Sequence, residues 1–263
     1  YNDGNGSNSG HVRVYQYNGS NWTKLGSDID GKVAGDYSGQ SMSLSSDGSI
    51  VAIGAIDANN HFNNTTGHVR VYQRDVTNTT VEPIGWTQLG SDIDGEAADD
   101  GSGWSVSLSS DGTIVAIGAP YNGNVNGSGH VRVYQYKIPT SEEWNNGNVI
   151  KGDDTTQEAN KYYWSQLGDD IDGEAEGDNS GYSVSLSSDG SIVAIGARKN
   201  DGNGNGSGHV RVYQWDGSTW TQLGTDIDGE AAGDNYSFGD YSGHSVSLSS
   251  DGSIVAIGAI YND

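Results

Sequence analysis

Aspartates at fixed spacing are the residues of this sequence best suited to binding chemistry. A D-I-D-G segment occurs four times, and a further aspartate follows its second aspartate by six residues each time. Calcium takes about six to eight oxygen ligands, which carboxylates, backbone carbonyls and water can supply around a glycine turn. The sequence therefore predicts calcium in these loops, with the ligands Asp28, Asp30, Asp36, Asp92, Asp94, Asp100, Asp170, Asp172, Asp178, Asp226, Asp228 and Asp234.

The same aspartates also have a purely structural interpretation. Aspartate and glycine are good turn residues, because the carboxylate accepts hydrogen bonds from nearby backbone N–H groups. In an extended D-x-D segment both carboxylates lie on one side, which is unfavourable unless a cation neutralises them. Bound calcium and turn hydrogen bonds are therefore both open explanations of the four loops.

A second repeated segment, G-H-V-R-V-Y-Q, places a histidine, an arginine and a tyrosine on one face of a strand. Its four copies carry four of the 12 lysines and arginines of the chain. A ring of histidines could bind a metal, but in so acidic a chain the arginines favour ion pairs. We expect each arginine to pair with a loop aspartate of its own or the adjacent repeat. The copies begin at Gly10, Gly67, Gly129 and Gly208.

Motifs for catalysis are missing from the sequence. It contains no cysteine, no nucleophile elbow, no zinc-protease helix and no phosphate-binding loop. Carboxylates are too abundant for one pair to be singled out as that of a glycosidase. The one unrepeated segment, residues 137–163, could serve recognition or cover a sheet edge. We accordingly expect that the chain is not an enzyme.

The composition narrows the classes of partner. Acidic residues outnumber basic ones by 35 to 12, which gives a formal net charge of -23. Such a surface repels nucleic-acid phosphates, so no nucleic-acid partner is expected. No apolar run approaches the ~18 residues of a membrane span, so we expect no membrane insertion. Nine N-x-(S/T) sequons suit a glycosylated extracellular protein; they begin at Asn5, Asn18, Asn21, Asn63, Asn64, Asn78, Asn126, Asn205 and Asn235.

All of these residues belong to a unit that occurs four times. Ser41–Ser45 alternates polar and apolar residues as a half-buried strand does, and Ile50–Ala55 is a continuous apolar run that suits a strand covered on both faces. A tight S-S-D-G turn joins the two. His68–Gln73 and Trp86–Leu89 supply the third and fourth strands, and nothing has helical periodicity. The tryptophan recurs once per unit, which predicts packing between neighbouring units at Trp22, Trp86, Trp164 and Trp220.

Four short strands per unit predict the blades of an all-β propeller. Tyr1-Asn2-Asp3 is repeated at the other end of the sequence, between a second and a third strand of the unit. We expect four four-stranded blades, one of them completed two-plus-two from both ends, so that the ring closes. The alternative is a four-blade segment of a longer propeller array. The single domain would cover residues 1–263, with units of about 1–55, 56–119, 120–197 and 198–263.

The pattern G-x-S-V-S-L-S-S-D-G-S-I-V-A-I-G-A, followed by G-S-G-H-V-R-V-Y-Q, resembles FG-GAP-type propeller repeats, the family of the integrin α-chain head. The resemblance covers nearly the whole chain. It implies an extracellular surface or adhesion protein, and it implies calcium in some blade loops. The family's calcium loops resemble D-x-(D/N)-x-D-G, whereas the equivalent turn at 44–48 has serines in place of the first acidic ligands.

The sequence therefore leads to an extracellular structural or adhesive propeller, a building block of a surface or filamentous assembly. Its partners would be other copies of itself, or extracellular proteins and glycans. The alternative function is a calcium-assisted module that binds carbohydrate or protein in the manner of a lectin.

Overall fold

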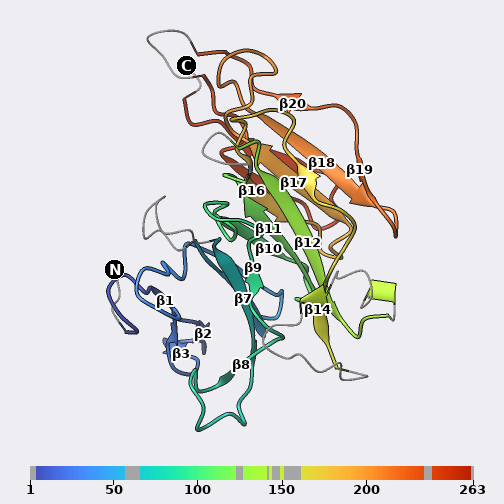
Figure 1. Ribbon diagram of the computed structural model, residues 1–263. Coiled ribbons are helices and arrows are strands. Elements are labelled where there is room, and N and C mark those ends of the chain that lie inside the picture. Colours follow the sequence, from blue (N-terminus) through green and yellow to red (C-terminus); the bar gives the residue numbers. More distant parts are fainter. Residues whose placement is uncertain are drawn as a thin grey trace.

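The computed structural model describes residues 4–56, 66–122, 127–140, 142–143, 149–150, 161–233 and 239–261. These residues form antiparallel sheets with almost no helix, as the alternating and continuous apolar patterns predicted. Three of the described sheets are complete blades, and the four principal strands of each lie side by side in the order of the sequence. In Figure 1 the sheets follow one another from β1, β2 and β3 at the lower left to β20 at the top.

Each complete blade has four principal strands and a short segment that pairs with the third of them. The first consists of β5 (Ser41–Leu44), β6 (Ile50–Ala55), β7 (His68–Arg74), β8 (Trp86–Gln88) and β9 (Ile93–Asp94). The second consists of β10 (Ser105–Leu108), β11 (Ile114–Ala119), β12 (His130–Lys137), β14 (Tyr163–Gln166) and β15 (Ile171–Asp172). The third consists of β16 (Ser180–Leu186), β17 (Ile192–Ala197), β18 (His209–Trp215), β19 (Trp220–Gln222) and β20 (Ile227–Asp228).

An incomplete blade stands at each end of this series. The leading half-blade consists of β1 (His11–Val12), β2 (Tyr15–Tyr17), β3 (Trp22–Lys24) and β4 (Ile29–Asp30). The trailing half-blade consists of β21 (Ser245–Leu248) and β22 (Val255–Gly258). Within the described residues no sheet joins the two, so the structure does not show the expected closure of the ring. The units expected from the sequence also cut each blade between its second and third strands.

The unrepeated segment adds one strand to the second blade. β13 (Val149–Ile150) pairs with β14, with Val149 opposite Ser165 and Ile150 opposite Trp164. It therefore covers the outer edge of that sheet, one of the two roles expected for residues 137–163. Trp144 of this segment lies outside the described residues.

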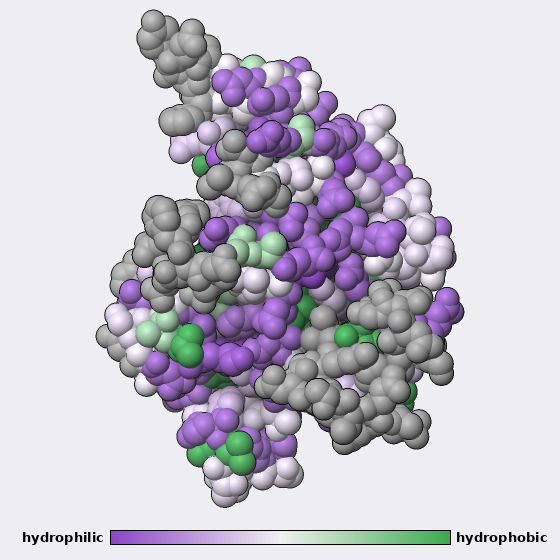
Figure 2. All heavy atoms as spheres, in the orientation of Figure 1, coloured by the Kyte–Doolittle hydropathy of each residue, from purple (hydrophilic) through white to green (hydrophobic). Residues whose placement is uncertain are grey.

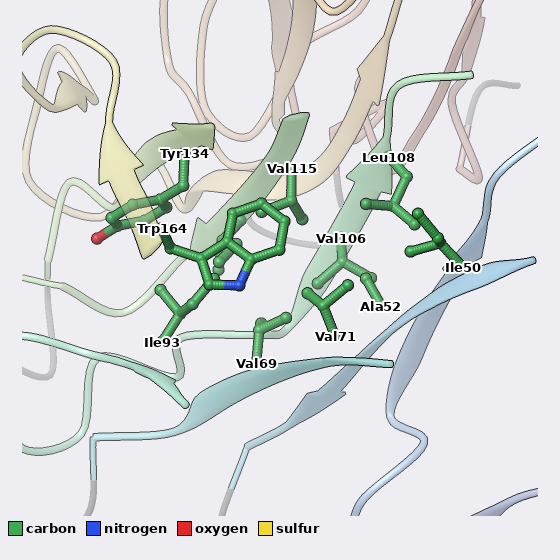
Figure 3. Close-up of a cluster of buried hydrophobic side chains, with 11 residues drawn as sticks. Ile50, Ala52, Val69, Val71, Ile93, Val106, Leu108, Val115, Tyr134 and Trp164 are labelled. Atoms are coloured by element: carbon green, nitrogen blue, oxygen red, sulfur yellow. The ribbon is translucent and has the colours of Figure 1, made fainter. Parts of the chain in front are cut away.

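Apolar packing between blades forms the core. The face of the first blade that carries Ile50, Ala52 and Val71 packs against Val106 and Leu108 of the second blade. Figure 3 shows these side chains pointing toward one another from the two sheets. The second and third blades repeat the same packing. Each blade thus buries one face against its predecessor and the other against its successor, as the continuous I-V-A-I run requires.

The alternating serines of each first strand bind the neighbouring blade. Ser41 Oγ donates to the carbonyl oxygen of Gly103 at 2.7 Å, and Ser43 Oγ accepts a bond from the Leu108 backbone N–H at 3.0 Å. The glycine of I-V-A-I-G-A leaves room for this contact, since a Cβ on Gly54 would lie 2.1 Å from the Gly103 carbonyl oxygen. Glycine is therefore required here by the close approach of two backbones.

Serines also close the S-S-D-G hairpins. Asp47 Oδ1 accepts bonds from the Ser49 backbone N–H at 2.9 Å and from the Ser45 hydroxyl at 2.7 Å. Ser45 Oγ in turn accepts the Ile50 backbone N–H at 2.9 Å. Ser45, one of the serines that stand in place of the acidic ligands of the family's calcium turn, thus hydrogen-bonds the single remaining aspartate.

The hairpin aspartates predict a specific dependence of stability on pH. Bonds from the Ser49 backbone N–H, the Ser49 hydroxyl and the Ser45 hydroxyl lower the pKa of Asp47 to about 2. Stabilisation by an aspartate whose pKa is lowered on folding is present above its unfolded pKa, here 3.8, and is lost as the pH falls through about 2. The difference in unfolding free energy between wild type and Asp47→Asn should therefore shrink between those values in denaturant titrations. A difference that stays constant across this range would contradict the role assigned to the carboxylate.

The inter-blade tryptophans provide a matched pair for a stability test. Trp164 is fully buried and its Nε1 donates to the Leu89 carbonyl oxygen of the previous blade at 2.7 Å, which confirms the predicted packing. Trp164→Ala should lower the unfolding free energy by about 3–5 kcal/mol. Trp22→Ala, at the equivalent but exposed position of the leading half-blade, should cost about 1 kcal/mol at most in the same dilute denaturant titration. Equal losses would show that the burial difference has no energetic consequence.

Candidate functional site

The D-I-D-G segments line the junctions between blades. In the first complete blade His68 lies opposite Asp94 and Val69 opposite Ile93. The isoleucine is buried in the core, so the aspartates on either side of it point away from the core. The same pairing places a histidine beside this acidic segment in the other blades.

The first aspartate of each segment is held by a residue four positions earlier. Asp92 Oδ1 accepts a bond from Gln88 Nε2 at 2.8 Å. The corresponding bonds from glutamine to Asp170 and Asp226 measure 2.7 and 2.6 Å. These bonds use one carboxylate oxygen and leave the other facing the junction.

Asp28 in the leading half-blade differs, because it has two cationic partners. It pairs with Arg13 at 2.8 Å and with Lys24. Hydrogen bonds from Arg13 and then from Lys24 lower the pKa of Asp28 well below its usual range. The expected arginine–aspartate pair is therefore found here within one repeat.

The other arginines of G-H-V-R-V-Y-Q cross to the preceding blade through its backbone. Arg70 Nη2 donates to the carbonyl oxygen of Asp30 at 2.9 Å, and Arg132 Nη2 donates to that of Asp94 at 2.9 Å. Arg211 makes the same bond to Asp172 at 2.6 Å. The second aspartate of D-I-D-G thus contributes its backbone carbonyl oxygen, which accepts the arginine hydrogen bond across the junction. The expectation of an arginine–aspartate side-chain pair does not hold for these three arginines, because their Nη2 groups bond the aspartate's backbone carbonyl oxygen instead.

The third aspartate of each loop caps a turn. Asp36, Asp100 and Asp178 are buried, and their carboxylates accept backbone N–H groups of the same loop. In the last unit Asp240 has this role, accepting the N–H groups of Glu230 and Ala231 at 2.8 Å each.

Asp234, the sequence-based candidate in the last unit, lies outside the described residues. The shared G-D-Y-S-G of residues 35–39 and 239–243 could have identified Asp240 instead. A fixed spacing from D-I-D-G missed it, because this loop is longer. Of the other predicted ligands, Asp30 is half-buried, while Asp94, Asp172 and Asp228 are exposed. Calcium at the D-I-D-G segments stays a prediction.

The structure brings together ligands that the sequence did not single out. Glu96 of one junction meets His130 and Asp170 of the next blade, and Glu174 meets His209 and Asp226 in the same way. Within each group the possible ligand atoms lie within 4.8 Å of one another. A third group joins His11 with Asp28 and Asp30, beside the paired Arg13.

Electrostatics at these groups follow from burial and like charge. Burial lowers the pKa of both His130 and His209, so their imidazoles are neutral near pH 7 and have a lone pair available. Burial and then the charge of Asp170 raise the pKa of Glu96. Carboxylates from successive blades thus repel one another at these junctions.

The exposed faces of the two half-blades form a second feature with functional potential. Trp22 of the leading half-blade is 68% exposed and Ile254 of the trailing half-blade is 69% exposed, whereas their counterparts Trp164 and Ile50 are 0% and 8% exposed. Elsewhere the visible surface is largely hydrophilic (Figure 2). Exposed apolar positions that are buried or partly buried in every internal copy indicate an interaction surface.

Comparison with known families identifies the repeat. Residues 171–213, which span β15 to β18, match the family model of the FG-GAP repeat. The chain carries an FG-GAP repeat. The resemblance deduced from the sequence is thus confirmed, and the matched segment includes the D-I-D-G strand and the G-H-V-R-V-Y strand of one FG-GAP unit. No curated protein matches the chain.

A solved structure similar to the chain is the periplasmic gluconolactonase of Pseudomonas aeruginosa. It shares 17% sequence identity with a TM-score of 0.41, and the match covers 97% of this chain and 73% of that one. The prediction that the chain is not an enzyme finds no support in this match, because the solved structure is that of an enzyme. Missing motifs exclude only the chemistries that those motifs serve. In the part of the chain that is described, no helix is long and apolar enough to span a membrane.

The described sequons differ in whether their amide nitrogen is available. Asn78 Nδ2 donates to the carbonyl oxygens of Val81, Pro83 and Trp86 at 2.9, 3.2 and 2.8 Å. Asn5 Nδ2 donates to the Gly31 carbonyl oxygen at 2.7 Å. Asn18, Asn21 and Asn205 are exposed, while Asn63, Asn64, Asn126 and Asn235 lie outside the described residues.

These contacts predict selective glycosylation when the protein is secreted from a eukaryotic host. Asn21 should carry a glycan, because its side chain is exposed, whereas Asn78 should not, because three carbonyls bind the nitrogen that would have to react. Glycopeptide mass spectrometry measures both occupancies in one sample. Full occupancy at Asn78 with none at Asn21 would contradict this assignment.

Proposed function

We propose that the protein is an extracellular structural building block whose half-blades are completed by a second copy of the chain. The trailing half-blade of one copy would supply strands one and two, and the leading half-blade of the next would supply strands three and four. The exposure of Trp22 and Ile254, at positions that internal blades bury, carries this proposal. It replaces closure within one chain by closure between chains.

The strand register of the complete blades specifies the pairing. In β6 and β7, Ile50 lies opposite Gln73 and Ala55 opposite His68. The other two complete blades keep this register. Applied to the half-blades, it sets Ile254 of one copy opposite Gln16 of the next. The sheet hydrogen bonds of β22 and of β1 and β2 would then be satisfied at once.

The same pairing would cover apolar residues on both sides of the new blade. Within the chain Ile50 packs near Leu108 of the following blade, which is 7% exposed, whereas its counterpart Leu44 is 50% exposed. Ile254 of the partner would occupy the equivalent place over Leu44. On the other side, Trp22 would meet Leu223 and Ile227 of the partner, both 41% exposed.

The tryptophan hydrogen bonds that join successive blades would also form between copies. Trp86, Trp164 and Trp220 donate to the carbonyl oxygens of Leu25, Leu89 and Leu167 of the preceding blade. Trp22 of the next copy would donate to that of Leu223 in the copy before it. A head-to-tail contact of this kind builds a filament when successive copies do not return to the first, and a closed ring when they do.

The composition suits a structural role outside the cell. A chain with no cysteine needs no reducing compartment. Its net charge of -23 repels acidic partners. The resemblance to FG-GAP repeats and the exposed sequons support the same location.

The assembly is tested by one disruptive substitution and its matched control. Ile254→Glu places a charge in the proposed junction, and Val76→Glu places the same charge at a similarly exposed branched apolar residue that belongs to neither half-blade. Light scattering after size exclusion should show assemblies for wild type and Val76→Glu, and monomers for Ile254→Glu. A wild type that is monomeric at all concentrations overturns the proposal.

Cysteine pairs separate association between chains from closure within one chain. Because the chain has no cysteine, Gln16→Cys and Ile254→Cys each introduce one thiol. A mixture of the two single variants should give a linked dimer with a short bifunctional thiol reagent, and neither variant alone should do so. A double variant that yields only internally linked monomers would show ring closure and overturn the proposal.

A further inference from the structure

The junctions on either side of the second complete blade differ from the first junction at the residue that directly follows D-I-D-G. The glutamates that follow D-I-D-G, Glu96 and Glu174, reach the histidine and first aspartate of the next blade. At the first junction the equivalent residue is Lys32. The three junctions therefore form a natural comparison of a cationic and an anionic residue at one place.

At the first junction, Lys32 occupies the position that Glu96 and Glu174 occupy at the other two. Its Nζ lies 2.6 Å from Asp92 Oδ2, and Asp92 is the aspartate beside His68. At the first junction the chain itself thus supplies a positive charge to the aspartate. Where glutamate replaces lysine, two carboxylates face each other and the side chain provides no such charge.

His209 points into the third junction without a hydrogen-bond partner. The residue is 1% exposed, and its Nδ1 lies 3.7 Å from Asp226 Oδ2 and 3.8 Å from Glu174 Oε2. Among the described residues neither ring nitrogen has a partner. A buried imidazole without a hydrogen bond is unfavourable. The distances are too long for hydrogen bonds, but they are close to the ~3.4 Å between donors that share a tetrahedral ion at about 2.0–2.1 Å.

The remaining oxygens of both carboxylates are already engaged. Gln222 Nε2 donates to Asp226 Oδ1 at 2.6 Å, which turns Oδ2 toward His209. Arg211 Nη1 lies 3.7 Å from Glu174 Oε1, which leaves Oε2 on the histidine side. The donors are therefore oriented by neighbours that do not themselves reach the centre of the group.

The second junction repeats this arrangement. His130 is 1% exposed, and its Nδ1 lies 3.6 Å from Asp170 Oδ2. Gln166 holds Asp170 Oδ1 at 2.7 Å, and Arg132 lies 3.7 Å from Glu96 Oε1. Two junctions of the same composition thus present the same three donors.

We propose that Glu96, His130 and Asp170, and likewise Glu174, His209 and Asp226, each bind a divalent transition-metal ion. One imidazole nitrogen and two carboxylate oxygens suit zinc and similar ions, with water completing the coordination. Each ion would link a glutamate of one blade to a histidine and an aspartate of the next. It would do at these junctions what the ammonium of Lys32 does at the first.

Zinc titration of the full chain, without an affinity tag, tests the proposal. Competition with a chromophoric chelator should show that the His130→Gln, His209→Gln double variant binds two fewer zinc equivalents than wild type. Glu174→Gln alters only a half-exposed side chain, so it should fold normally while weakening one site at least tenfold. Circular dichroism and melting in a chelator establish that each variant is folded. Unchanged zinc binding in these folded variants overturns the assignment.

The natural lysine supplies reciprocal controls. Glu174→Lys reproduces the first junction and should abolish one site, whereas Lys32→Glu should create an additional site with His68 and Asp92. Zinc should raise the melting temperature of wild type and leave that of the double histidine variant unchanged, since only binding to the folded state stabilises it. A Lys32→Glu variant that gains no site, or a wild type that binds Ca²⁺ but no Zn²⁺, would overturn the proposal.

Discussion

Apolar packing between successive blades is the interaction on which the rest of this structure depends. Each sheet is thin and apolar on both faces, so it is stable only when a neighbour covers each face. Ala52 and Val71 on one sheet and Val106 and Leu108 on the next meet in this way. The low hydrophobic content of 33% suffices because these residues are concentrated between blades.

This constraint explains the polar residues as well. Once the blades are in contact, backbone groups at their edges need partners, and the repeated serines, arginines and tryptophans provide them across the junction. Arg132 and Trp164 both donate to carbonyl oxygens of the preceding blade. Buried backbone carbonyls without such bonds would cost stability. Polar repeat positions are therefore part of the packing and need no ligand to account for them.

The same constraint creates the two functional features. A stack of sheets that each need two neighbours leaves an uncovered face at each end, which is where Trp22 and Ile254 are exposed. It also brings acidic loops of successive blades together, so that Glu174 of one meets Asp226 of the next. The proposed assembly surface and the proposed metal sites thus both follow from stacking.

Much of the local structure could be predicted from the sequence, because its causes are local. Period-two alternation at 41–45, the apolar run at 50–55 and the S-S-D-G turn between them predicted strands and hairpins that the structure contains. The spacing from D-I-D-G predicted Asp234 as the third aspartate of the last unit. In this longer loop Asp240 takes the capping role instead. Loop length changes which residue reaches the turn, and a fixed spacing from D-I-D-G does not record that.

By itself the sequence determined an all-β repeat of FG-GAP type, its strands, its turns and the acidic character of its loops, because each depends on neighbouring residues. Only the tertiary structure decided which residues meet between blades, including Lys32 with Asp92 and His209 with Glu174. It also decided that the half-blades stand apart within the described chain. The physical reason is that these contacts join residues 60 and 35 positions apart that lie in different blades, and only the stacking geometry brings their side chains together.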